Sequence, residues 1–596
     1  MKRIASILIN IGVIAFLSAC ADKNSGSDEQ INSQITKVYV NGRVYTQDNA
    51  APWAEGFVVI DDKFVAVGDA ESLKSWMTPE SETIDLAGQF VMPGFVEEHI
   101  HPDMATESYL GINIVPSMGW EKVSHIIETF GEQKSDDKWI IGGALNWLAD
   151  NGEKMHQIDA LSHFTTLDKL INDKPLLLWD VGGHAVLINS LGLKKLGIDE
   201  NSTAPEGGII VKDKDGQPTG VLRETAANMA YEIALKDLPK GRELINSGIK
   251  PIFSQLNQFG ITSITDAWAR AYMLDAYKTL ADSGELTLRI KAYIADPIEW
   301  LSPEWKEAAS NAIANHQAYK VDHWLNADGV KFVLDGSAGG QTIIMVEPYE
   351  GTSDQHGGPW RNDPDYFAEK FSEYDKKGHV MKVHAVGSQS IRTALDAIEK
   401  SRENGSTLRH NIAHTVFVHP DDIKRFKEHN VGVEFSPHFW YPVSGWDIIR
   451  DELGQRRLDW AFPFKTLKNE GVAISVGSDW PVAESPNPFL ELETMVTRQV
   501  PGGGGEILSD PKERISLSDA IEVFTIGGAF AQNREDIIGS IETGKLADFI
   551  ILNQNLFEIE INQVHKTRVI QTVVGGKTVY ETKTETEKGT TNGSTL

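Results

Sequence analysis

The chain has 596 residues, 41% of them hydrophobic and 24% charged, which is ordinary for a globular protein large enough for more than one domain. Its 85 acidic and 56 basic side chains give a formal charge of −29, which would repel phosphate backbones and argues against a nucleic-acid partner. A single cysteine excludes an internal disulfide and a cysteine-based metal site.

The first twenty residues have the pattern of a bacterial targeting segment. A charged start is followed by an apolar stretch from Ile4 to Leu17, too short for a transmembrane helix. The sequence Leu17 to Cys20 then resembles the bacterial lipobox, whose cysteine is lipidated. We therefore expect a lipoprotein signal peptide over 1–20 and acyl chains on Cys20 that hold the protein at the cell envelope, at the outer membrane facing the periplasm. The alternative is an ordinary signal peptide with a chance cysteine.

Short strand-like runs occur at both ends of the remaining chain. After a polar tether at 21–34, the first runs lie between residues 35 and 92, and the same texture returns at 538–582 after about 450 residues. We predict that both ends build one small composite β-sandwich domain. The tail at 583–596 is rich in Thr, Lys and Glu and is expected to be disordered.

Between these ends, apolar strands alternate with helical patterns, which predicts an α/β fold, a (β/α)₈ TIM barrel over 93–537. The eight predicted strands are Phe90–Glu97, Ile261–Ala267, Leu288–Ile294, Val330–Asp335, Val380–His384, Asn411–His414, Val431–Ser436 and Ala473–Asp479. Residues about 104–250 do not fit the alternation. They are predicted to be one large insertion after the first barrel strand.

Candidate metal ligands follow these strands in chain order. His99 and His101 are two residues apart, so on a strand both imidazoles point to the same face. Histidine is the commonest metal ligand among side chains, and the carboxyl ends of barrel strands form the active-site rim. The later strands end in or contain His384, His414, Asp479 and Lys331. Together these residues predict a metal centre at the barrel mouth.

This pattern resembles the amidohydrolase superfamily, and within it the large-insert subgroup, amidohydrolase family 3, that includes N-substituted formamide deformylases. The motifs of the barrel and the chain end that carry the resemblance are Pro93-Gly94-Phe95, Asp335-Gly336-Ser337, His384-Ala385-Val386-Gly387, Gly477-Ser478-Asp479 and Gly539 to Asp548. In the insertion, Gly182-Gly183-His184 and Pro218 to Glu224 also match the subgroup.

The resemblance implies one or two divalent ions, each held by side chains at the strand ends. The ligands would be His99, His101 and Asp479 for one ion, and His384 and His414 for the other. Lys331 would carry a carbamate that bridges the ions. The alternative is an unmodified lysine paired with Asp335 or a neighbour, with a mononuclear site. Zinc suits such ligands best, and manganese and iron are the other options.

The sequence departs from the family pattern at three places. Glu97 stands where an aspartate is usual, Ala413 where a glutamate is common, and Ser388-Gln389 where an Asp-Arg pair is common. None of these changes removes a predicted ligand. They affect residues that orient ligands and contact the substrate, so the identity of the substrate stays open.

The function implied is hydrolysis of a carbon–nitrogen bond of a non-peptide amide, such as an N-formyl or N-acyl amine. Asp479 would shuttle the proton as general base and then general acid, and His184 could hydrogen-bond the developing oxyanion. A cyclic amide, lactone, carbamate or ester is the alternative substrate for the same centre. A lipid-anchored binding protein without turnover is the alternative from another class, and a homodimer is left open.

Aromatic and polar side chains near the predicted strand ends are candidates for the wall of a substrate pocket. They are Trp147, Trp268, Trp480, His438 and Glu224. Such a pocket would suit a small-molecule amide with an apolar part. The competing interpretation is that at least half of the tryptophans belong to the core.

Overall fold

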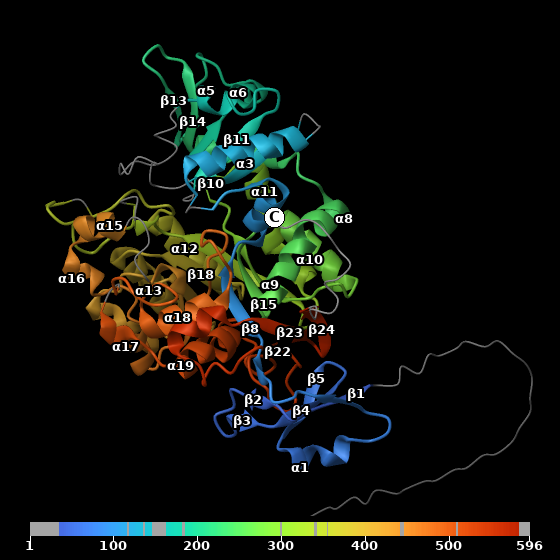
Figure 1. Cartoon of the computed structure of the whole chain (residues 1–596). Helices are drawn as coiled ribbons and strands as arrows, with labels where there is room; N and C mark the ends of the chain where they lie inside the picture. The colour runs from blue at the N-terminus through green and yellow to red at the C-terminus, as the bar shows by residue number, and fades with distance from the viewer. Residues whose placement is uncertain are drawn as a thin grey trace, which may run out of the picture.

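The structure, a computed structural model, describes ten stretches of the chain. They are residues 35–115, 118–134, 138–145, 163–180, 185–298, 301–338, 342–354, 356–440, 446–507 and 510–582. A barrel lies in the middle of the molecule, a small β-domain at one end and the insertion at the other (Figure 1). In these stretches no helix combines the length and the apolar character needed to cross a bilayer.

The barrel is an eight-stranded parallel sheet whose strands follow one another in chain order. Its strands are β8 (Phe95–Ile100), β15 (Ile261–Ala269), β16 (Arg289–Ala295), β17 (Leu325–Val333), β18 (Val380–Ala385), β19 (Asn411–His414), β20 (Gly432–Phe435) and β21 (Ile474–Val476). The last strand returns to the first, where Ile100 forms a parallel bridge with Trp480 and the Asp479 N–H donates to His99 O at 2.7 Å. The predicted barrel is therefore confirmed.

Helices cover the outside of the barrel between successive strands (Figure 1). They include α10 (Ala271–Asp282), α11 (Pro303–Ala314), α12 (Pro364–Lys376), α13 (Ser388–Glu403), α14 (Ile423–Glu428), α17 (Phe464–Asn469) and α18 (Pro488–Thr497). Local sequence fixes where they start. Asp363 accepts from the N–H groups of Asp365 and Tyr366, and Pro364 fills the first helical position, where no N–H is needed.

The predicted first strand, Phe90–Glu97, is wrong as a single element. It divides at Gly94 into β7 (Phe90–Pro93), which belongs to the small domain, and β8, which belongs to the barrel. A Cβ at Gly94 would lie 2.2 Å from the Thr262 side chain, so the chain passes between the two sheets where only glycine fits. A continuous apolar run does not reveal this change of sheet, because both halves are buried.

The small domain packs two sheets face to face. One holds β5 (Lys63–Gly68), β4 (Gly56–Ile60), β1 (Thr36–Val40) and β6 (Glu82–Asp85), and the other holds β24 (Lys577–Glu581), β23 (Val569–Val574), β22 (Phe549–Leu552), β7, β2 (Arg43–Tyr45) and β3 (Trp53–Ala54). Tyr39 and Phe57 from the first sheet meet Phe549 from the second, with ring centroids 5.2 and 4.8 Å from that of Phe549. Both ends of the chain thus share one core.

The insertion is built on a six-stranded sheet with apolar residues on both faces. Its strands run in the order β13 (Gly208–Lys212), β14 (Pro218–Glu224), β12 (Ala185–Ile188), β11 (Leu176–Asp180), β10 (Ile140–Leu145) and β9 (Ile112–Asn113). Leu176 and Leu178 pack toward α3 (Trp120–Gln133), and Leu177 packs toward α6 (Ser190–Leu196) and α7 (Thr225–Leu235). Alternate residues therefore serve opposite faces, as strand geometry requires.

Candidate metal centre

Three side chains from opposite ends of the barrel sequence converge at its mouth. His101 Nε2 lies 3.1 Å and His99 Nε2 lies 3.6 Å from Asp479 Oδ1. The potential ligand atoms of these three residues all fall within 4.8 Å of one another. His99 is fully buried, and Asp479 is 7% exposed. Two imidazoles and a carboxylate at this spacing form a donor set that suits a divalent ion.

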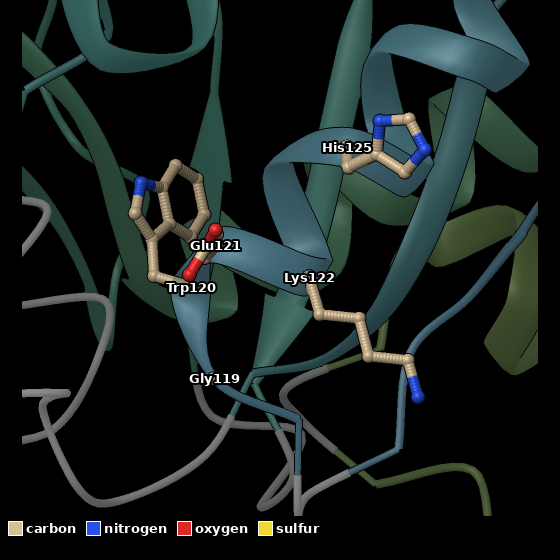
Figure 2. Close-up of a pocket in the computed structure, with 5 residues that line it drawn as sticks. All are labelled: Gly119, Trp120, Glu121, Lys122 and His125. Carbon is tan, nitrogen blue, oxygen red and sulfur yellow. The ribbon is translucent and has the colours of Figure 1, made fainter.

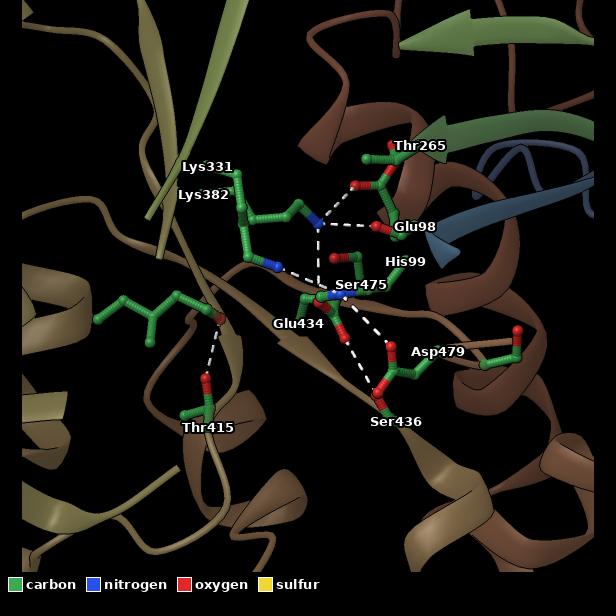
Figure 3. A network of polar contacts seen from close by, with 12 residues as sticks. Glu98, His99, Thr265, Lys331, Lys382, Thr415, Glu434, Ser436, Ser475 and Asp479 are labelled. Atoms are coloured by element: carbon green, nitrogen blue, oxygen red, sulfur yellow. Dashed lines mark hydrogen bonds and ion pairs between the residues drawn. The ribbon is translucent and has the colours of Figure 1, made fainter. Parts of the chain in front are cut away.

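The backbone at the strand ends brings these residues together. The pairing of β8 with β15 shifts between Glu97 and Ile100, so that consecutive residues Glu98 and His99 both join the polar network of Figure 3. Asp479 and His414 have positive φ angles of 61° and 66°. Left-handed backbone is uncommon for residues other than glycine and is found preferentially at functional sites.

His384 and His414 stand beside the first three residues. The ring centroids of His384 and His414 are 4.5 Å apart, and those of His414 and His99 are 4.6 Å apart. Lys331 Nζ lies 3.3 Å from His99 Nε2. The structure therefore gathers all six predicted ligands in one region, at the carboxyl ends of β8, β18, β19 and β21 and on β17.

Glu97, the departure from the usual aspartate, holds two ligand-bearing segments together. Its Oε1 accepts from the His99 N–H at 3.0 Å and from the Ser478 N–H at 2.9 Å. Ser478 precedes Asp479, so one carboxyl group sets the spacing between the first and last barrel strands. Asp335 fixes the backbone that follows His384, because its carboxyl oxygens accept from the N–H groups of Val386 and Gly387 at 3.0 and 2.8 Å.

A buried charged network beneath the centre was missed by sequence reasoning. Glu434 on β20 places a carboxyl oxygen against His99 Nδ1, and Lys382 on β18 stands between Glu434 and Glu98 (Figure 3). Glu98, Lys382 and Glu434 are all 0% exposed. The signal in the sequence is a single charged residue inside an otherwise apolar central strand, as in Val380-Met381-Lys382-Val383.

Burial sets the protonation of the histidines. It lowers the pKa of His384 to about 3, and the nearby Lys331 charge adds to this effect. Burial likewise lowers the pKa of His99 and His414 well below the usual value. The three imidazoles are therefore neutral at pH 7 and keep the lone pairs that a metal ligand needs.

The buried lysine and glutamate are shifted toward their neutral forms. Burial lowers the pKa of Lys331 to about 7, with the Lys382 charge as the second cause. Burial raises the pKa of Glu434 to about 8, although Lys382 and Lys331 oppose this rise. An amine that is half unprotonated near neutral pH has the lone pair that carbamate formation requires.

A half-buried arginine links the barrel rim to the insertion. Arg270, directly after β15, donates to Glu107 Oε1 at 2.9 Å and lies 3.2 Å from Asp103 Oδ2. Both carboxyl groups belong to α2 (Pro102–Leu110), which follows His101. The Arg270 guanidinium also lies 5.7 Å from the ring centroid of Tyr231, on α7 of the insertion. The insertion is thus joined to the segment that carries the first two predicted ligands.

The predicted pocket residues have different surroundings. Glu224 accepts from Arg361 Nη1 at 3.0 Å and has a φ of 51°. Trp268 is half-buried on β15, and Trp480 is 8% exposed and accepts from the His101 N–H through its backbone oxygen. His438 is buried, with Nε2 3.3 Å from Glu491 Oε1 on α18. Cys20, Trp147 and His184 lie outside the described residues.

A cavity of about 550 Å³ lies away from this centre, in the insertion (Figure 2). It is lined by the start of α3, from Gly119 to Lys122, and by His125. None of the six predicted ligands lines it. The candidate metal centre is therefore located from the cluster of predicted ligands and not from this cavity.

Comparison with known proteins finds relatives over most of the chain. A model of the amidohydrolase family matches residues 82–580. The protein YtcJ of Bacillus subtilis (strain 168) is 28% identical over 560 residues, covering 91% of this chain and 99% of its own. The N-substituted formamide deformylase of Arthrobacter pascens is 24% identical over 560 residues, covering 91% of this chain and 98% of its own.

A solved structure shows the same fold. The crystal structure of an uncharacterized metal-dependent hydrolase from Pyrococcus furiosus superposes with a TM-score of 0.68 at 24% identity and covers 87% of this chain and 99% of its own. The family model spans most of the chain, from the small β-domain through the barrel to the last strands. This chain therefore belongs to the amidohydrolase family.

Proposed function

We propose that the protein hydrolyses the carbon–nitrogen bond of a small non-peptide amide, such as an N-formyl or N-acyl amine. The observation that carries the proposal is the convergence of His99, His101 and Asp479 within 4.8 Å at the barrel mouth. The likeness to a formamide deformylase over nearly its whole length supports this bond type. A cyclic amide, a lactone, a carbamate or an ester is the competing substrate class for the same centre.

The residues present fit one or two divalent ions. Neutral buried imidazoles and a carboxylate are the ligands that zinc prefers, with manganese and iron as the other options. His99, His101 and Asp479 would hold one ion, and His384 and His414 would hold a second. A carboxylated Lys331, which the low amine pKa favours, would supply oxygens to both.

Chemistry at this centre needs an activated water and an acid for the leaving group. A divalent ion supplies a polarised carbonyl and a water acidic enough to ionise near neutral pH. Asp479 takes the proton of the attacking water on a carboxylate oxygen and returns it to the leaving nitrogen. Glu97 accepts from the backbone N–H groups of His99 and of Ser478, the residue before Asp479, and so holds the two segments at a fixed spacing. His184, from the insertion, donates to the developing oxyanion in this proposal.

The proposal is tested with the full chain loaded with zinc and assayed against matched N-formyl amines, N-acyl amines, lactones and esters. Turnover of the linear amides well above that of the oxygen esters is expected. Preference for a lactone or an ester would contradict the amide assignment and favour the competing substrate class. No turnover of any of these substrates by a zinc-loaded protein would favour a binding protein.

Asp479→Asn is the matched variant for this assay. It keeps an oxygen ligand but loses the proton acceptor, so turnover should fall by about 10²- to 10⁴-fold while much of the zinc is retained. Zinc content and kcat are measured on the same preparation. Near-normal kcat in this variant would contradict the proton shuttle.

We also propose that Cys20 is lipidated and holds the enzyme at the bacterial envelope. The sequence from Leu17 to Cys20 supports this. Cys20→Ser should release the protein from the membrane fraction, and retention of that variant with the membrane would contradict the anchor.

A further inference from the structure

Glu434 lies on β20, the seventh barrel strand, from which no ligand is predicted. Its Oε2 lies against Nδ1 of His99 (Figure 3). An imidazole has two ring nitrogens, and when one donates its N–H to an ionised carboxylate the other keeps the lone pair that a metal needs. The arrangement therefore applies to the charged form of Glu434. In His99 that nitrogen is Nε2, which lies 3.6 Å from Asp479 Oδ1. The contact with Glu434 therefore selects the nitrogen that faces the predicted ligands.

Two further side chains hold Glu434 in place. Lys382 Nζ lies 3.7 Å from Glu434 Oε2 and donates to the backbone oxygen of Glu98 at 2.7 Å. Ser436 Oγ donates to Glu434 Oε1 at 3.4 Å. Both Lys382 and Glu434 are 0% exposed, so neither group can turn away into water. The carboxyl group is thus fixed from two sides before any ion is considered.

We propose that Glu434 is a positioning residue of the metal centre, which orients His99 so that Nε2 faces His101 and Asp479, with Lys382 as the group that holds Glu434. The inference rests on the metal centre of the proposed function and adds a residue from a strand outside the ligand pattern. It concerns the His99-containing site. His384 has other partners, since its Nε2 lies 3.1 Å from Gly336 O and 3.6 Å from Asp335 Oδ1.

Glu98 supplies a matched control. It is as deeply buried as Glu434 and faces the same lysine, at 3.5 Å from Lys382 Nζ. Its other oxygen accepts from Thr265 Oγ1 at 2.8 Å, and among the described residues it makes no hydrogen bond to the His99 ring. Loss of Glu98 therefore disturbs the buried charges without releasing His99.

The test measures zinc binding to the metal-depleted full chain by competition with a chromophoric chelator. Glu434→Met, which has similar length and no acceptor, should weaken the tightest zinc site by about 10- to 100-fold, the usual cost of losing a group that orients a ligand. Glu98→Gln should bind zinc close to the unaltered protein. Equal losses in both variants, or none in Glu434→Met, would overturn the proposal.

A second variant separates orientation from folding. Glu434→Met leaves Lys382 buried beside one carboxyl group fewer, and this can lower stability by itself. The double variant Glu434→Met with Lys382→Met also removes the buried cation and leaves Glu98 with its hydrogen bond from Thr265, so the thermal midpoint should recover in part while the zinc affinity stays weak. Recovery of zinc affinity together with the midpoint would overturn the positioning role.

Zinc binding also separates this inference from the choice of substrate. A protein that binds zinc and hydrolyses no amide would contradict the proposed function and leave the role of Glu434 intact. An unaltered protein that binds no zinc would overturn both.

Discussion

Two residues at this centre have a backbone conformation that is usually unfavourable for residues other than glycine. His414 and Asp479 both have left-handed backbone, which costs about 1–3 kcal/mol per residue when the surroundings do not compensate. The hydrogen bond from the Asp479 N–H to His99 O, at 2.7 Å, is one such compensation. The turn directs each side chain back over the barrel mouth, so strand alternation alone would not have placed them there.

Lys331 gives the clearest dependence on pH. Its pKa is lowered from 10.5 to about 7, mainly by burial, so the amine is charged below pH 7 and free above it. Only the free amine can add CO₂. With ¹³C-labelled CO₂ held at a fixed dissolved concentration, the carbamate signal in NMR should build up about tenfold faster at pH 8 than at pH 6, because the rate follows the free-amine fraction. Lys331→Met should give no such signal, and a signal that builds up at the same rate at both pH values would contradict the shifted pKa.

At the scale of elements, the strand pattern and the ligand positions could be predicted, but the change of sheet at Gly94 could not. Seven of the eight predicted strands each overlap one barrel strand. Short apolar runs that alternate with helical segments are compatible with few structures other than a parallel sheet covered by helices. Gly94 joins two strands that are both buried. The apolar sequence pattern indicates burial, and it does not indicate to which sheet each strand belongs. Glu434 and Lys382 were missed because their partners lie on other strands, and pairing across a barrel is a property of three-dimensional structure.

The joint between the insertion and the barrel depends on Arg270. Its guanidinium meets Asp103 and Glu107 on α2 and lies 4.5 Å from the Trp305 ring centroid on α11. Arg270→Met would leave two buried carboxyl groups without their cation, a loss of about 3–5 kcal/mol. We expect a lower thermal midpoint and faster tryptic cleavage within the insertion.

The exposed pair of Lys278 and Asp282 on α10, at 2.7 Å, provides the comparison. Lys278→Met removes one salt bridge at the surface and should cost less than about 1 kcal/mol. If Arg270→Met behaves like Lys278→Met in both measurements, the joint does not depend on this arginine.

At the scale of the whole molecule, the two ends of the chain are held together by the small domain. β7 pairs with β22 through Met92 and Ile550, and Asp548 forms a buried ion pair with Arg289 of the barrel at 2.6 Å. The sheet that contains β7 therefore needs the last strands of the chain, and the barrel is linked to the same segment.

Ending the chain after residue 547 should therefore abolish most soluble protein, because β7 loses one of its two partner strands, β22, and Arg289 loses Asp548. Ending it after residue 582 keeps all three final strands and should leave the soluble yield and thermal midpoint unchanged. Soluble yields of the two shortened chains, expressed side by side, decide the matter. A soluble, monodisperse product from the shorter chain would show that the sheet tolerates the loss.

The pairing of β7 with β22 also has a consequence for biosynthesis. β7 ends at Pro93 and β22 begins at Phe549, so an early strand must wait for nearly the whole polypeptide to be made. At about 5–20 residues per second, a ribosome needs on the order of half a minute or more to deliver the missing partner. During that time the nascent chain carries an open, apolar strand edge, and such edges invite aggregation. Chaperones that shield growing chains should therefore raise the yield of this protein more than that of a barrel enzyme whose terminal strands pair locally.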